Sequence, residues 1–139
     1  VLASRAGERR VAARDFFRGL YETALRPDEV LLAVELPIAP ASARATLQEL
    51  ARRRGDYAIV GLAAVATPAD LRLAWFGVGP VPLRTPLAEA ALAAGDLAAA
   101  QAALEQELDP PADLHGPPAL RRHLARVLLG RAAPLLKGA

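Results

Sequence analysis

The sequence predicts an α+β fold in which a three-stranded antiparallel sheet packs on a three-helix layer. Apolar runs of strand length, alternating or continuous, occupy the chain before residue 79, and apolar residues at helical spacing follow it. Strands first and helices afterwards are typical of an antiparallel sheet that is covered on one face. A length of 139 residues suits one such domain and a smaller piece of another.

The smaller piece comes first in the chain. Residues 1–14 predict a hairpin, because two short strand-like runs flank an Ala-Gly-Glu turn. Residues 15–21 are amphipathic at helical spacing, and residues 30–36 predict a strand that ends at Pro37. The stretch PIAPAS that starts there holds two prolines, which disfavour regular structure on both sides, so we expect a linker at residues 38–43.

Three strands are expected after the linker. Residues 44–53 suit a strand or a helix, because their leucines fit either spacing. Residues 57–67 are almost wholly apolar and predict a central strand, in which Gly61 marks a bulge or a close approach of another segment. Residues 71–78 alternate, and the five residues 67–71 can close an antiparallel hairpin between the last two strands.

Three helices are expected from residue 85 onward. Thr85, which precedes a proline, predicts the start of a helix that Gly95 ends. Asp96 predicts the N-cap of the second helix, a proline pair at 110–111 ends it, and the proline pair at 117–118 starts the third. Apolar residues at helical spacing predict the buried faces of the last two helices: Leu97, Ala100, Leu104 and Leu108 in one, and Leu120, Leu124, Val127 and Leu128 in the other.

Composition excludes several function classes. The absence of cysteine excludes disulfides, zinc–thiolate sites, ligation of iron–sulfur clusters by this chain and thiol catalysis. A net charge of +2 and only 4% aromatic residues argue against a nucleic-acid surface. The longest uncharged run, 58–69, is too short to span a bilayer and no secretion signal is visible, so we expect a cytoplasmic protein without membrane insertion. Arginine in place of lysine and frequent proline resemble adaptation to heat or to high genomic GC content.

Most residues of types that can catalyse a reaction or bind a metal lie in sequence contexts that do not favour such a role. Neither serine sits in a glycine-flanked elbow, and His115 and His123 stand eight residues apart in surface-like contexts, so we expect no catalytic residue and no metal site. The stretch GVGP at 77–80 lacks the helix start that phosphate binding needs and predicts a turn at the end of a strand. Glu105 and Glu107 read as surface residues at the end of a helix.

Asp56 and Tyr57 are the remaining candidates. They lie between three arginines (52–54) and nine residues (58–66) without a charge. One interpretation is a turn carboxylate and an amphipathic tyrosine at a strand edge. The other is an aromatic ring at the exposed rim of a sheet, where it can stack on a planar ligand at little entropic cost.

Four ordered blocks of the chain resemble one family. They are RDFFRGLYETALRPDEVLLAVELP (14–37), RRRGDYA (52–58), FGVGPVPLR (76–84), and DLHG (113–116) with RRHLA (121–125). Together they are similar to the C-terminal portion of the FAD-binding (medium) subunit of molybdenum hydroxylases, the flavoprotein of carbon-monoxide dehydrogenase and the equivalent region of xanthine dehydrogenase. One departure is Leu120, where the family usually has tyrosine.

The resemblance implies a division into residues 1–37, the close of the FAD-binding (PCMH-type) domain, and residues 44–139, the C-terminal domain. It implies transfer of electrons from 2Fe-2S clusters in a small subunit, reduced by a molybdopterin-containing large subunit, through FAD to an acceptor. In that setting Tyr57 would lie near the isoalloxazine ring with Asp56 shaping the same corner, and the arginines 52–54 would neutralise phosphate or face a partner.

The family's glycine-rich loops for the FAD diphosphate lie in an N-terminal portion that is missing here. We therefore expect the isolated chain to be inactive and to retain little FAD, since one stacked ring contributes only about 1–3 kcal/mol by analogy with base stacking. Two alternatives stay open: a module that assembles subunits and binds no cofactor, and an arginine-rich nucleic-acid binder.

Overall fold

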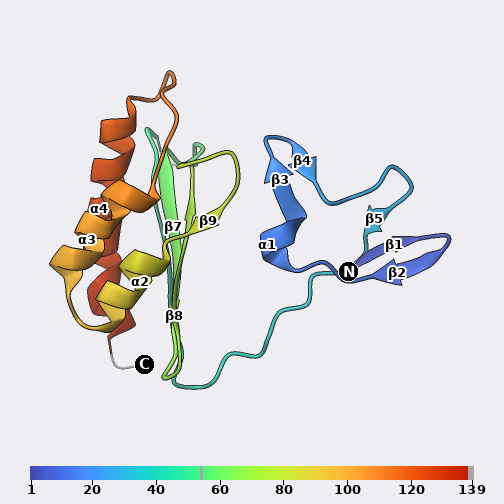
Figure 1. Ribbon diagram of the computed structural model, residues 1–139, viewed down its shortest axis with the longest axis horizontal. Helices are drawn as coiled ribbons and strands as arrows, with labels where there is room; N and C mark the ends of the chain where they lie inside the picture. Colours follow the sequence, from blue (N-terminus) through green and yellow to red (C-terminus); the bar gives the residue numbers. More distant parts are fainter. Residues whose placement is uncertain (54, 138–139) are drawn as a thin grey trace. The chain divides into compact units, whose positions relative to one another are not determined.

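A computed structural model describes residues 1–53 and 55–137 and divides the chain into two compact units, Val1–Ala39 and Pro40–Ala139 (Figure 1). The division falls inside the proline-rich stretch 37–42. No helix in the described part of the chain is long and apolar enough to cross a membrane.

The first unit is built from short elements. β1 (Leu2–Ser4) and β2 (Gly7–Arg9) form the expected hairpin, and β5 (Val30–Leu31) pairs with β1 on its other side. The helix expected at residues 15–21 is wrong beyond Phe16: α1 (Ala13–Phe16) leads into β3 (Phe17–Gly19), which pairs with β4 (Glu22–Thr23). Tyr21, with a φ of 57°, turns the chain between these two strands, and a left-handed residue cannot continue a helix. The strand expected at 30–36 ends after Leu31.

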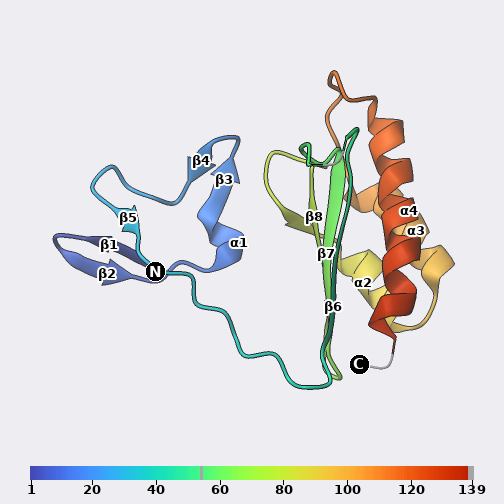
Figure 2. The ribbon, with the colours of Figure 1, turned by 180° about the vertical axis from the view of Figure 1, so that it is seen from behind.

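The second unit holds an antiparallel sheet of four strands in the order β6 (Arg44–Leu50), β7 (Val60–Ala66), β8 (Leu71–Phe76) and β9 (Leu83–Arg84). The first three confirm the expected strands and settle the ambiguous one. β9 adds a fourth that the sequence analysis missed, because two residues carry no readable period. Three helices cover one face of the sheet, α2 (Pro86–Ala93), α3 (Leu97–Glu107) and α4 (Pro118–Leu136), so the α+β class is confirmed (Figures 1 and 2).

The core lies between the sheet and the helices. Alternate residues of β7 and β8 point to the helices, as the period of two predicts, and Trp75 is the largest of the fully buried side chains. Gly61 faces the other side, and a Cβ there would lie 1.9 Å from Phe76 Cζ. Its pairing is uninterrupted on both edges, so it marks a close approach and not a bulge. The expected face of α3 is confirmed, with Ala100, Leu104 and Leu108 buried.

The buried face of α4 is rotated by one residue from the expected one. Leu120 is 37% exposed, whereas Arg121 is only 4% exposed. The expected stripe was built from apolar residues only, so it left out Arg121 and was displaced by one residue. The residues that α4 buries are Arg121, Ala125, Leu128, Leu129, Ala132, Ala133 and Leu136.

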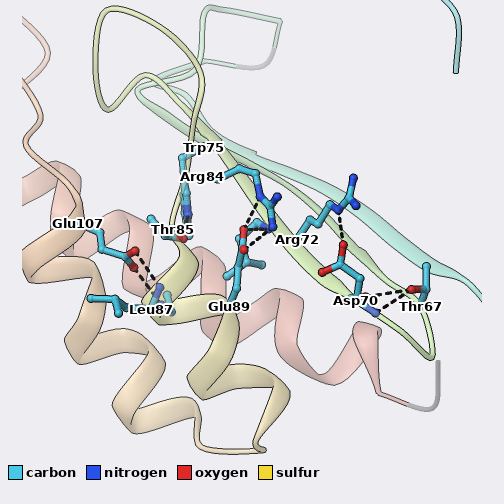
Figure 3. A network of polar contacts seen from close by, with 11 residues as sticks. Thr67, Asp70, Arg72, Trp75, Arg84, Thr85, Leu87, Glu89 and Glu107 are labelled. Carbon is cyan, nitrogen blue, oxygen red and sulfur yellow. Dashed lines mark hydrogen bonds and ion pairs between the residues drawn. The ribbon is translucent and has the colours of Figure 1, made fainter. Parts of the chain in front are cut away.

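Polar side chains join the helices to the sheet (Figure 3). The buried Trp75 indole donates to Thr85 Oγ1 at 2.9 Å, so this hydroxyl does not cap α2. Glu107 supplies the cap instead: its carboxylate accepts from the N–H groups of residues 87 and 88 at 2.9 and 3.0 Å. The assignment of Glu107 to the open surface is therefore wrong. Glu89, also buried, accepts from the Leu73 amide at 2.8 Å and from Arg84.

Candidate functional site

The candidate site is the corner that joins β6 to β7, which we call the Tyr57 corner (residues 51–59). Gly55, with a φ of +84°, turns the chain, and the Asp56 amide donates to the Arg53 carbonyl at 3.2 Å. The Asp56 carboxylate accepts from the Tyr57 amide at 2.9 Å. The Tyr57 side chain is 95% exposed, so its ring is open to a planar ligand. Asp56 shapes the backbone of the corner.

The arginines before the corner differ in their contacts. Arg52 donates to the Leu114 carbonyl at 2.9 Å and so links the corner to the turn at 113–116. Arg53 is exposed. Arg54, the third arginine of the run, lies outside the described residues.

Beneath the corner, Arg121 joins three distant segments. Its Nη1 donates to the carbonyls of Ile59, at 2.6 Å, and of Gly77. Its Nη2 donates to Asp113 at 2.6 Å. The arginine side chain is 5% exposed and that of Asp113 is 39% exposed, so the positive charge is buried while its partner still reaches water.

The contact sets the ionisation of Asp113. The Arg121 guanidinium, bonded to the carboxylate, lowers the pKa of Asp113, and the backbone N–H of His115 lowers it further. Both donors favour the charged carboxylate. Asp113 is therefore an anion at neutral pH and neutralises the buried arginine.

Gly77, at the end of β8, completes the set of contacts beneath the corner. We call this set, formed by Ile59, Gly77, Asp113 and Arg121, the frame. The turn expected at 77–80 is confirmed: Gly77 follows the last residue of β8 with a φ of +76°. A Cβ at Gly77 would lie 2.5 Å from the Ile59 carbonyl oxygen, so only glycine lets the two segments approach this closely. The same oxygen accepts from Arg121.

Sequence reasoning found the exposed pair of the corner and missed the residue beneath it. Arg121 was noted only within a block of family resemblance. The signal that could have found it is its spacing: residues 121, 125, 128 and 132 form an apolar stripe if the arginine is accepted as part of it. His115 and His123 are both exposed.

The described residues contain no group of three or more His, Cys, Asp or Glu side chains that could hold a metal ion. A groove of about 780 Å³ lies between the β7–β8 turn and the ends of α2 and α4. That turn follows Ala66, whereas the Tyr57 corner precedes Val60, so groove and corner lie at opposite ends of β7.

Residues 45–134 match the CO dehydrogenase flavoprotein C-terminal domain. The chain belongs to this family. It is 35% identical to the carbon monoxide dehydrogenase medium chain of Afipia carboxidovorans, over 94% of this chain and 49% of the relative. It is 30% identical to the glyceraldehyde dehydrogenase medium chain of Sulfolobus acidocaldarius, over 95% of this chain and 50% of the relative.

Solved structures agree with the family. CO dehydrogenase from Oligotropha carboxidovorans matches with a TM-score of 0.88 and 33% identity, over 99% of this chain and 52% of that chain. Quinoline 2-oxidoreductase from Pseudomonas putida 86 matches with a TM-score of 0.86 and 34% identity, over 97% of this chain and 50% of that one. This family member thus spans about half the length of the relatives it matches.

Proposed function

We propose that this chain is the C-terminal part of the FAD-binding subunit of a molybdenum-containing hydroxylase, which passes electrons from 2Fe-2S clusters through FAD to an acceptor. The supporting observation is the match of almost the whole chain to medium chains of such enzymes. The relatives are named for different substrates: carbon monoxide, glyceraldehyde and quinoline. A segment that enzymes with different substrates have in common is expected to serve the electron transfer that they share. It is not expected to select the substrate.

Within that function we propose that Tyr57 covers the isoalloxazine ring of FAD and that Asp56 holds the tyrosine backbone in place. The fit is partial. Tyr57, a residue that is 95% exposed, offers an aromatic face for stacking. The described residues hold no glycine-rich loop at a helix start for the diphosphate. FAD, when bound, supplies the redox chemistry, and the residues of this chain would orient the ring and keep water from it.

For the first unit we propose that residues 1–37 close the FAD-binding domain, that 38–43 are a linker and that 44–139 form the C-terminal domain. The unit buries little of its apolar surface: only Leu2 and Ala24 are core residues in it. Large apolar side chains stay exposed on it, as expected of a piece that a larger domain would cover. The most exposed of these are Leu20, Tyr21, Val34, Leu36 and Ile38.

The partners that this function implies are a molybdopterin-containing large subunit and a 2Fe-2S small subunit. The remaining FAD-binding portion would bind the diphosphate of FAD. The isolated chain is then expected to hold little FAD, because association itself costs more than one stacked ring contributes.

A hybrid subunit tests the proposal. The half of the Afipia carboxidovorans medium chain that the match leaves uncovered would be joined ahead of Val1 and produced with the other two CO dehydrogenase subunits. We expect the purified hybrid to carry FAD, seen by its visible absorbance, and carbon monoxide to bleach this absorbance as electrons reach the flavin. The present chain alone is expected to purify without FAD.

Two variants test the ring contact in the same hybrid. Tyr57→Ala is expected to weaken FAD binding by about 5- to 150-fold, which is the loss of about 1–3 kcal/mol of stacking. Leu47→Ala is the control, because this residue is 68% exposed and lies in β6, outside the unit that the FAD-binding domain would cover. Equal FAD binding in both variants would remove Tyr57 from the site. A hybrid that assembles with both partners but takes up no FAD would favour the assembly module instead.

A further inference from the structure

The Arg121 guanidinium donates hydrogen bonds to backbone groups that are far away in the sequence. Two of its acceptors, the carbonyls of Ile59 and Gly77, are main-chain atoms, and the third is the Asp113 carboxylate. The two carbonyls lie 62 and 44 residues before the arginine. One guanidinium therefore fixes the start of β7, the turn after β8 and the turn before α4 with respect to one another.

The tie to Ile59 bears directly on Tyr57, two residues earlier. The Ile59 amide donates to the Leu50 carbonyl at 2.8 Å, and the Ile59 carbonyl accepts from Arg121. Both backbone polar groups of this residue are thus held. Two residues earlier, within the described part of the chain, the Tyr57 amide donates only to its own neighbour, Asp56. Ile59 is the anchor from which the exposed tyrosine projects.

Stability alone does not account for a buried arginine at this point. Replacing a buried ion pair by apolar residues of similar volume is often neutral or stabilising. The Arg121 Nε is buried and finds no acceptor among the described residues, which is itself a cost. A side chain with such costs is explained by the geometry that it imposes on the two carbonyls.

We propose that Arg121 is a positioning residue: it holds the Tyr57 corner in a single conformation through Ile59 and Gly77. This inference rests on the proposed function for the value of a fixed Tyr57, but the order of the corner is a property of this chain by itself. Arg52 donates to the Leu114 carbonyl and so also restricts the corner, at its other end.

Backbone amide exchange in the full 139-residue chain tests the proposal. Arg121→Lys keeps the charge beside Asp113 but has one nitrogen for three acceptors, and it is expected to fold. Exchange at the Ile59 amide, which donates to the Leu50 carbonyl, is expected to become about tenfold faster, while the inner strands β7 and β8 keep their protection. Arg121→Met, which leaves Asp113 unpaired, is expected to give a larger effect at the same amide.

The matched control is Arg122→Met. Arg122 is the next residue of α4 and also donates to a backbone carbonyl, that of Leu108, but it does not touch the corner. This control is expected to speed exchange near residue 108 and to leave exchange at the Ile59 amide unchanged. Unchanged exchange at the Ile59 amide in Arg121→Lys, or faster exchange spread evenly over β7 and β8, would overturn the proposal.

A flavin readout in the hybrid separates the inference from the proposed function. Arg121→Lys is expected to weaken FAD binding, and this effect is expected to vanish when Tyr57 is already alanine, because two residues acting through one contact are not additive. Equal effects of Arg121→Lys with and without Tyr57 would count against positioning. If Tyr57→Ala leaves the FAD affinity of the hybrid unchanged, the proposed contact between Tyr57 and the flavin is refuted. The amide-exchange data then test the role of Arg121 by themselves.

Discussion

Substituting alanine for Gly77 should test how rigidly the frame beneath the Tyr57 corner is built. The residue has a φ of +76°, and its added Cβ would lie 2.5 Å from the Ile59 carbonyl oxygen. Ordinary van der Waals contact begins at 3.4 Å, so the overlap is 0.9 Å (3.4 minus 2.5). The atom met is a backbone oxygen, which cannot swing aside as a side chain can, and it is the acceptor of Arg121.

Gly77→Ala has two costs, the left-handed backbone conformation and the steric overlap. The same substitution at a second glycine measures the first cost alone. Gly95, at the end of α2, has a φ of +84° and nothing within 4 Å of its added Cβ. Gly95→Ala therefore carries only the left-handed conformation, about 1–2 kcal/mol. Gly77→Ala carries the same cost and the overlap, which overpacking data put at about 1–3 kcal/mol. We expect Gly77→Ala to lower the free energy of unfolding by about 2–5 kcal/mol.

The assay is urea unfolding followed by the fluorescence of Trp75. This is the single tryptophan of the chain and lies in the core of the second unit, so the signal reports that unit alone. The free energy of unfolding should fall further in Gly77→Ala than in Gly95→Ala at an unchanged m-value. Equal losses in the two variants would show that the Ile59 carbonyl moves aside freely, and the rigid frame would be refuted.

Three further outcomes follow from the polar contacts. Glu107→Ala should cost about 1 kcal/mol by uncapping α2, whereas Glu105→Ala, which breaks only an exposed ion pair, should change urea stability little. Thr85→Val should cost about 1–3 kcal/mol in the same assay, because the buried Trp75 indole loses its acceptor. Glu29, which accepts from an arginine in the first unit, has its pKa lowered from 4.5 to about 2. The ionised Glu29 therefore stabilises the folded first unit fully above pH 4.5, and this stabilisation is lost as the pH falls through 2. Amide exchange of the first unit should show this pH dependence in the native chain but not in Glu29→Gln.

The sequence was most informative where local chemistry decides the structure. The hairpin at 67–71, the Asp96 cap and the alternation in β8 all depend on near neighbours, and all three are confirmed. The first unit shows the limit of such reasoning. Residues 15–21 have helical spacing, yet a helix there competes with pairing between β3 and β4, and the pairing wins.

The polar frame depends on contacts that no local pattern reveals. Glu107 caps a helix through the amide of Leu87, 20 residues earlier, and Arg121 donates to a carbonyl 62 residues away. In a single sequence each looks like an ordinary surface charge, because charged residues are seldom buried unless they are paired. The partners become visible only when the fold brings them together, so Arg121 was missed, whereas the exposure expected of Tyr57 could be predicted from its neighbours.

The order of the corner decides whether Tyr57 can contribute to binding at all. By analogy with base stacking, a stacked ring contributes about 1–3 kcal/mol. Ordering the backbone of one loose residue costs about 1–2 kcal/mol. If only Tyr57 and its neighbour Ala58 had to become ordered when a ligand arrived, this cost would cancel the whole gain from stacking. Arg121 and Leu50 hold both backbone groups of Ile59, and the Asp56 carboxylate accepts from the Tyr57 amide, so on our proposal part of that cost is met when the chain folds. If Tyr57 covers the flavin as we propose, the buried arginine and the exposed tyrosine act through one contact, and removing the arginine should weaken flavin binding by the tyrosine.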